Sequence, residues 1–123
     1  MEMSKKTVLE IVRNTLSPEQ IERSFIYWDR RSLKKGEQIK AGPQTITIPF
    51  DGTMIFVDLA PRFNWAHPCL YLLVNERDLR TEVAKASFPP YSNKFPETFI
   101  IILRYGEEPP HERYFQIFDE RKM

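Results

Sequence analysis

The feature that most limits the fold is a change of hydrophobic period after Gln44. Residues 45–50 alternate between polar and apolar side chains, and residues 53–59 continue as a second extended run. A period of two is typical of a β-strand with one buried face. Asp51-Gly52 lies between the two runs, and an Asp-Gly pair favours the type I′ turn of a two-residue hairpin. We therefore predict an antiparallel hairpin with strands 44–50 and 53–59.

That turn implies a register, which divides the side chains of the hairpin between two faces. One face carries Ile46, Ile48, Ile55, Val57 and Leu59, and the other carries Thr45, Thr47, Met54, Phe56 and Asp58. The second face is too apolar to lie against water, so we expect a second sheet, the helices or another subunit to cover it. Pro49 cannot donate a hydrogen bond, which predicts that the first strand lies at a sheet edge.

Four further strands are expected along the rest of the chain. Residues 69–75 and 98–105 are apolar at successive positions, as is typical of central strands that are covered on both faces. Residues 80–88 and 113–118 are predicted to be strands of more ordinary character. The region 44–119 is therefore predicted to form about six mostly antiparallel strands.

The first third of the chain is predicted to be helical. Val8, Leu9, Val12 and Leu16 recur at helical spacing, which indicates an amphipathic helix over 4–16. Ser17-Pro18-Glu19-Gln20 has the residues of a capping box with proline at the first helical position, so a second helix is predicted from Pro18 to about Lys35. The fold class is accordingly α+β, in one domain over 1–123 with a helical segment 1–36. A β-sandwich and a single curved sheet with helices packed on one face both fit the pattern.

Composition narrows the functional classes. The 123 residues include 18 basic and 17 acidic side chains, and this balance gives no general attraction to nucleic acid or membranes. The longest apolar run, 99–103, is too short to span a membrane. The single cysteine, Cys69, excludes an internal disulfide. With no signal-like N-terminus, we expect a soluble cytoplasmic protein.

His67 and Cys69 are the residues most suggestive of chemistry. They lie two positions apart, so an extended chain points both side chains the same way. A thiolate beside an imidazole is the core of a cysteine nucleophile or half of a zinc site, and Asp58 joins them if the sheet brings it near. A buried structural cysteine beside a loop histidine explains the pair more simply. We expect no metal and no cofactor, and keep a small enzyme centred on these residues as an alternative.

Aromatic loops favour a binding function. The segment 88–96 contains three prolines and the aromatic residues Tyr91 and Phe95, which together with Phe63, Trp65 and His67 would rim a groove for a protein or peptide. In the alternative interpretation this segment closes one end of the core. The leading hypothesis is a non-catalytic protein- or peptide-binding module that uses an exposed sheet edge, with a homodimer as one version.

The last candidate binding surface is a basic patch. Arg30, Arg31, Lys34 and Lys35 fall at the end of the predicted second helix, beside Tyr27 and Trp28. Cations contact phosphates and aromatic rings stack on bases, so nucleic-acid binding is a second alternative. Cations also complement the dipole at a helix C-terminus. Because the net charge is only +1, we favour the dipole explanation and do not expect a nucleic-acid partner.

Overall fold

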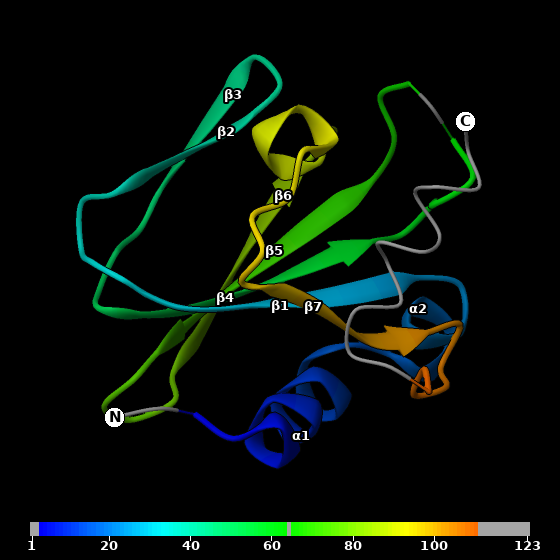
Figure 1. The fold of residues 1–123 in the computed structure, drawn as a ribbon, viewed down its shortest axis with the longest axis horizontal. Coiled ribbons are helices and arrows are strands. Elements are labelled where there is room, and N and C mark those ends of the chain that lie inside the picture. The colour runs from blue at the N-terminus through cyan, green and yellow to red at the C-terminus, as the bar shows by residue number, and fades with distance from the viewer. Residues whose placement is uncertain (1–2, 64, 111–123) are drawn as a thin grey trace.

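A computed structural model describes residues 3–63 and 65–110 (Figure 1). The α+β class and the mostly antiparallel strands are confirmed. The helices are α1 (Lys5–Thr15), α2 (Pro18–Glu22) and the short 3₁₀ helix η1 (Pro90–Asn93). The strands are β1 (Phe25–Leu33), β2 (Gln38–Ala41), β3 (Gln44–Thr47), β4 (Gly52–Asp58), β5 (Cys69–Asn75), β6 (Thr81–Ala86) and β7 (Phe99–Arg104). Five strands form one antiparallel sheet in the order β6-β5-β4-β1-β7, and β2 pairs with β3.

Helix α1 covers one face of the large sheet. Ser4 caps its start, because the hydroxyl oxygen of Ser4 accepts a hydrogen bond from the backbone N–H of Thr7 at 3.1 Å. The expected apolar stripe is confirmed, and it packs on inward-facing side chains of β1, β4, β5 and β7. Its buried members are Val8, Leu9, Ile11 and Val12. Each such side chain contributes about 1.5–3 kcal/mol of burial free energy.

The opposite face of the sheet is covered by the β2–β3 hairpin and the segment around η1. Ile39 and Ile46 of the hairpin share a buried cluster with Met54 and Phe56 of β4, and Phe95 packs against it. Figure 1 shows α1 on one side of the sheet and the hairpin on the other. The expected cover on both faces of strands β5 and β7 is therefore confirmed. The prediction that residues 98–105 form a central strand is wrong, because β7 ends the five-stranded sheet of the described residues. It is nevertheless buried, because these layers extend over it.

The prediction of a second helix reaching Lys35 is wrong beyond Glu22. The capping box itself is confirmed, with Gln20 and Ser17 exchanging backbone-to-side-chain hydrogen bonds of 2.9 and 3.2 Å. Residues 25–33 then form β1, the strand between β4 and β7. Phe25 and Tyr27 enter one core cluster while Ile26 and Trp28 enter the other. A segment buried on two opposite faces satisfies a strand, whereas a helical stripe would bury only one side.

The predicted hairpin at Asp51-Gly52 is also wrong. Strand β3 turns back onto β2 through Gly42, whose φ is +64°, whereas β4 pairs with β1 and β5. Gly52 is the first residue of β4, and a β-carbon at this position would collide with the backbone carbonyl oxygen of Val74. The glycine thus permits a close approach of two strands rather than a turn.

The predicted faces were partly right. Ile55, Val57 and Leu59 share one cluster, while Met54 and Phe56 lie on the other face. Ile46 and Ile48 belong to the cluster of Met54, because β3 is part of the separate hairpin. The predicted strands 69–75, 80–88 and 98–105 correspond to β5, β6 and β7. The predicted strand 113–118 lies outside the described residues. No helix within the described part of the chain has both the length and the apolar character needed to span a membrane.

Candidate functional site

Strand β6 is the last strand at one edge of the large sheet in the described part of the chain. Within residues 3–63 and 65–110 it pairs only with β5. The backbone N–H of Asn75 donates to the carbonyl oxygen of Arg80 at 2.8 Å, so Arg80 faces β5. Successive residues of a strand turn their backbone groups to opposite sides, so those of Thr81, Val83 and Lys85 face away from β5. The Lys85 carbonyl oxygen agrees with this, since it accepts a hydrogen bond from the side chain of Gln44 at 3.1 Å.

A cleft lies between this edge and helix α1. Its volume is about 570 Å³, and it is lined by α1 residues such as Ile11 and Asn14 together with Leu79 and Thr81. Val83 follows two residues after Thr81 and therefore projects from the same face of β6. The exposed fractions of Leu79 and Val83 are 41% and 47%. Apolar surface and backbone groups that face away from β5 thus occur together along one margin of the sheet.

The loop that connects β4 to β5 presents two exposed aromatic side chains. Phe63 is 65% exposed and Trp65 is 84% exposed. The backbone N–H of His67 donates to the carbonyl oxygen of Ser87 at 2.9 Å. Ser87 directly follows β6, so this hydrogen bond joins the aromatic loop to the end of that strand.

Strand pairing brings Asp58 to His67 and Cys69. Asp58 ends β4 and lies opposite Cys69, the first residue of β5. The possible ligand atoms of Asp58, His67 and Cys69 all lie within 4.8 Å of one another. The imidazole Nε2 is 2.9 Å from a carboxylate oxygen of Asp58, and Nδ1 is 2.6 Å from the carbonyl oxygen of Trp65. The conditional expectation that Asp58 would join the pair is therefore met.

The environment of Cys69 does not favour a nucleophile. Cys69 is 1% exposed, and its thiol lies 3.5 Å from the carbonyl oxygen of His67. Burial, reinforced by the negative charge of Asp58, raises the pKa of Cys69 to about 12. A nucleophilic cysteine needs a lowered pKa, because the thiolate is the reactive form. The geometry gives no support to the alternative of a cysteine enzyme.

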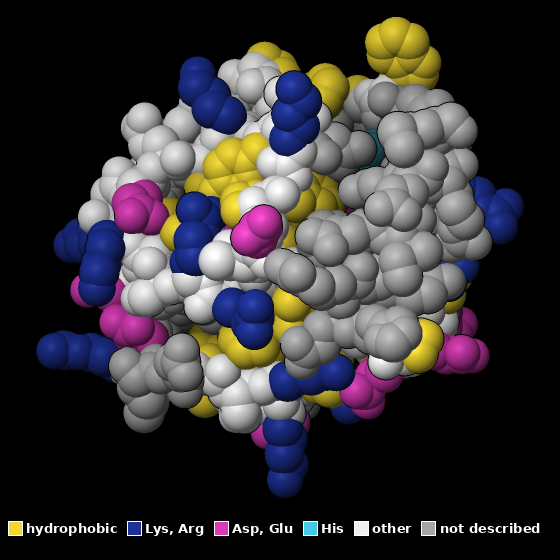
Figure 2. All heavy atoms as spheres, viewed as in Figure 1, with side chains coloured by type: hydrophobic (Ala, Val, Ile, Leu, Met, Phe, Trp, Pro, Cys, Tyr) yellow, Lys and Arg dark blue, Asp and Glu magenta, His cyan; other side chains and the backbone are white. Residues whose placement is uncertain are grey.

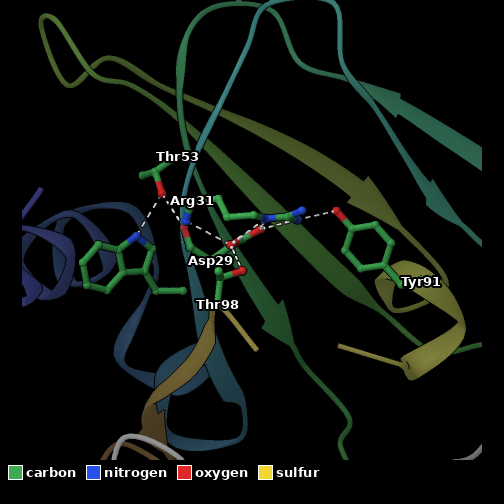
Figure 3. Close-up of polar contacts among 6 residues, drawn as sticks. Asp29, Arg31, Thr53, Tyr91 and Thr98 are labelled. Atoms are coloured by element: carbon green, nitrogen blue, oxygen red, sulfur yellow. Dashed lines mark hydrogen bonds and ion pairs between the residues drawn. The ribbon is translucent and has the colours of Figure 1, made fainter. Parts of the chain in front are cut away.

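Tyr91 and Phe95 both make contacts within the fold. The Tyr91 hydroxyl accepts a hydrogen bond from the guanidinium of Arg31 at 2.9 Å, and Arg31 also pairs with the fully buried carboxylate of Asp29 at 2.6 Å (Figure 3). Thr98 donates to the same carboxylate at 2.7 Å. The hydrogen bonds that the Arg31 guanidinium donates to the Asp29 carboxylate raise the pKa of Arg31 further above its ordinary value. Phe95 packs against the second core cluster, so the segment 88–96 closes the core.

The four basic residues do not form the end of a helix. Arg30 and Arg31 lie in β1, and Lys34 and Lys35 directly follow it. The dipole explanation therefore does not apply to them. Arg31 is engaged by Asp29, while the other three are exposed. On the face shown in Figure 2, basic side chains are scattered among acidic ones and do not gather into one patch.

Comparisons with known proteins supply no relative for this chain. No family model, no curated protein and no solved structure matches it. Sequence reasoning found β6 as a strand but missed Thr81, Val83 and Leu79 as site residues. The signal was the polar and charged composition of residues 80–86, which is typical of an edge strand and contrasts with the apolar run 69–74.

Proposed function

We propose that the protein is a non-catalytic module that binds an extended segment of a partner protein by adding it as a strand to β6. The observation that carries this proposal is the outward-facing backbone of Thr81, Val83 and Lys85 beside the α1 cleft. Strand addition uses main-chain hydrogen bonds for affinity and alternate side-chain sites for specificity. The outward-facing backbone of β6 offers the main-chain hydrogen bonds, and the α1 cleft offers the side-chain sites.

The geometry defines the chemistry of the partner segment. Three residues with outward-facing N–H and C=O groups offer six hydrogen-bonding positions, of which Gln44 already occupies the Lys85 carbonyl oxygen. Each bond contributes about 0.5–1.5 kcal/mol net. Every second side chain of an added strand would lie on the α1 side, beside Val83 and Leu79. The proposed ligand is therefore an extended peptide with apolar residues at alternate positions and no proline at the pairing positions.

The aromatic loop is the proposed second contact. His67 ties this loop to Ser87, so a segment that continued past Lys85 would meet the loop carrying Trp65. Exposed tryptophan is typical of interface anchors. Phe63 would add apolar area from the same loop.

Two finer features belong to this proposal. A second copy of the chain is one form of partner, in which two β6 edges would pair, and measurement of molecular mass at high protein concentration tests that version directly. A reducing cytoplasmic location is the expected setting, supported by a single free and buried cysteine.

A matched pair of variants at Val83 tests the function. Peptides are selected from a random display library on the immobilised protein, and their affinities are then measured for the wild type, Val83→Pro and Val83→Thr. Proline removes the outward-facing N–H and blocks an added strand, whereas threonine keeps the N–H and the β-branched shape. We expect Val83→Pro to abolish binding and Val83→Thr to weaken it only a few-fold. Equal binding by all three folded proteins would contradict strand addition.

A further inference from the structure

We propose that Asp58, His67 and Cys69 form a binding site for a zinc-class divalent transition-metal ion. The three residues come from the end of β4, from the loop after it and from the start of β5. Antiparallel pairing places Asp58 directly opposite Cys69, and the loop returns His67 between them. This inference is independent of the peptide-binding proposal.

Hydrogen bonding prepares His67 as a ligand. A carbonyl oxygen can only accept, so the contact of 2.6 Å between Nδ1 and the Trp65 carbonyl oxygen places a hydrogen on Nδ1. In the neutral ring Nε2 then carries the lone pair that binds metals. Metal-binding histidines usually donate their other ring N–H to a carbonyl or carboxylate in this way, which fixes the orientation of the ring.

The Nε2 atom has no hydrogen-bond partner although it is buried. His67 is 8% exposed, and Nε2 makes no hydrogen bond despite lying 2.9 Å from a carboxylate oxygen of Asp58. In the ring with its only hydrogen on Nδ1, the Nε2 lone pair and a carboxylate oxygen repel each other at that distance unless a metal cation lies between them. A buried polar atom without a hydrogen bond requires an explanation, and a shared metal ion supplies one here.

The donor set selects the class of metal. One sulfur, one imidazole nitrogen and one carboxylate oxygen suit zinc and its neighbours, whereas magnesium and calcium prefer oxygen alone. In a tetrahedral zinc site the ligand atoms are roughly 3.3–3.8 Å apart, as Zn–N, Zn–O and Zn–S distances of about 2.0–2.3 Å require. The ligand atoms here lie within 4.8 Å of one another, so modest side-chain rotations would bring them to that spacing.

The site has a route to solvent and a place for a fourth ligand. His67 and Cys69 line a cleft of about 580 Å³ together with Gln20, Lys85 and Ser87. Three protein ligands leave the fourth tetrahedral position for water or another donor that enters through the cleft. The bound ion would also hold the loop carrying Trp65 against the ends of β4 and β5.

Titration of the metal-free full chain with Co²⁺ tests this site. Cobalt bound to a thiolate gives a sulfur-to-metal charge-transfer absorption, so it reports the Cys69 bond directly. We expect one equivalent of Co²⁺ to produce this absorption, Zn²⁺ to displace it, and excess Mg²⁺ to leave it unchanged. Absence of the charge-transfer absorption at saturating Co²⁺ would overturn the proposal.

Variants establish whether all three residues act together. We expect Cys69→Ser to eliminate the charge-transfer absorption, and Asp58→Asn and His67→Gln each to weaken Co²⁺ binding at least ten-fold. Asp78→Asn, which alters an exposed carboxylate in the β5–β6 turn, should bind as the wild type does. Unchanged affinity in Asp58→Asn and His67→Gln would show binding to the thiol alone and would overturn the site. A rise in the wild-type thermal midpoint with Zn²⁺ but not Mg²⁺ gives a second readout should a variant fail to fold; no rise would contradict the proposal.

Discussion

The side-chain amide of Gln44 donates a hydrogen bond of 3.1 Å to the backbone carbonyl oxygen of Lys85, 41 residues later. Gln44 is the first residue of β3, and Lys85 lies on the outer edge of β6. The β2–β3 hairpin therefore already satisfies one of the acceptors that an added strand would use. A side chain rather than a strand fills this position, and in the proposed complex a partner segment would replace it.

Removal of this competing hydrogen bond is expected to improve peptide binding. Gln44→Ala leaves the Lys85 carbonyl oxygen available to the partner, and one hydrogen bond of about 1 kcal/mol corresponds to an increase in affinity of roughly five-fold. Gln38→Ala, which removes an exposed glutamine of the same hairpin, is the control and should leave the affinity unchanged. Calorimetric titration with a selected peptide measures both variants. Weaker binding by Gln44→Ala would contradict the proposed competition.

A substitution at Gly52 tests whether this residue begins a strand or lies in a turn. Asparagine is well tolerated in a type I′ turn, but any side chain at the start of β4 collides with the carbonyl oxygen of Val74. We expect Gly52→Asn to lower the free energy of unfolding by at least about 2 kcal/mol, as overpacking of a close strand contact does. Urea denaturation checks this value. A loss below about 0.5 kcal/mol would indicate that Asp51-Gly52 is a turn.

The half-exposed side chain of Arg31 is expected to stabilise the fold through its ion pair with the buried carboxylate of Asp29. Arg31→Ala leaves the fully buried carboxylate of Asp29 without its cation and should cost about 3 kcal/mol of stability. Lys5→Ala is the matched control, because Lys5 forms a solvent-exposed pair with Glu108 and should cost no more than about 0.5 kcal/mol. Denaturant unfolding compares the two variants. Equal losses would mean that Asp29 is adequately satisfied without the guanidinium.

The raised pKa of Cys69 leads us to expect that the metal-free protein loses stability at high pH. Its pKa is raised to about 12 in the folded state from an ordinary value near 9. Below pH 9 the thiol is neutral in both states and does not lower the free energy of unfolding. As the pH rises from 9 toward 12, the thiol ionises in the unfolded chain first, so the free energy of unfolding falls. Between pH 9 and 10.5 the wild type should lose about 2 kcal/mol relative to Cys69→Ala. Unfolding measurements on both proteins at pH 8 and 10.5 test this, and a constant difference would contradict it.

Local patterns in the sequence predicted the elements that depend on local chemistry. The stripe of Val8 and Val12, the capping box of Ser17 and Gln20, and the apolar strand 69–75 are all confirmed. Each depends on side-chain spacing within one segment. The need for cover on both faces of the sheet also followed from composition, because two-sided apolar strands cannot lie against water.

Pairing between distant segments was not predictable in the same way. The spacing of Ile21, Phe25 and Trp28 fits a helix, yet these positions divide between α2 and β1 because two layers bury both sides of β1. Asp51-Gly52 resembles a turn, but Gly52 is required by its contact with Val74. For the candidate sites, His67 and Cys69 were visible as a pair, whereas their association with Asp58 depends on the register of β4 and β5. The position of β6 at the edge of the described sheet depends on the order of all five strands.

Backbone hydrogen exchange along β6 tests strand addition most directly. Exchange of individual amides is followed by NMR in the free protein and with a saturating selected peptide. The account predicts that the outward-facing amides of Val83 and Lys85 exchange quickly in the free protein and become strongly protected in the complex. The amides of Glu82 and Ala84, which face β5, should be protected in both. Formation of a complex in which Val83 and Lys85 still exchange at their free rates would contradict the account.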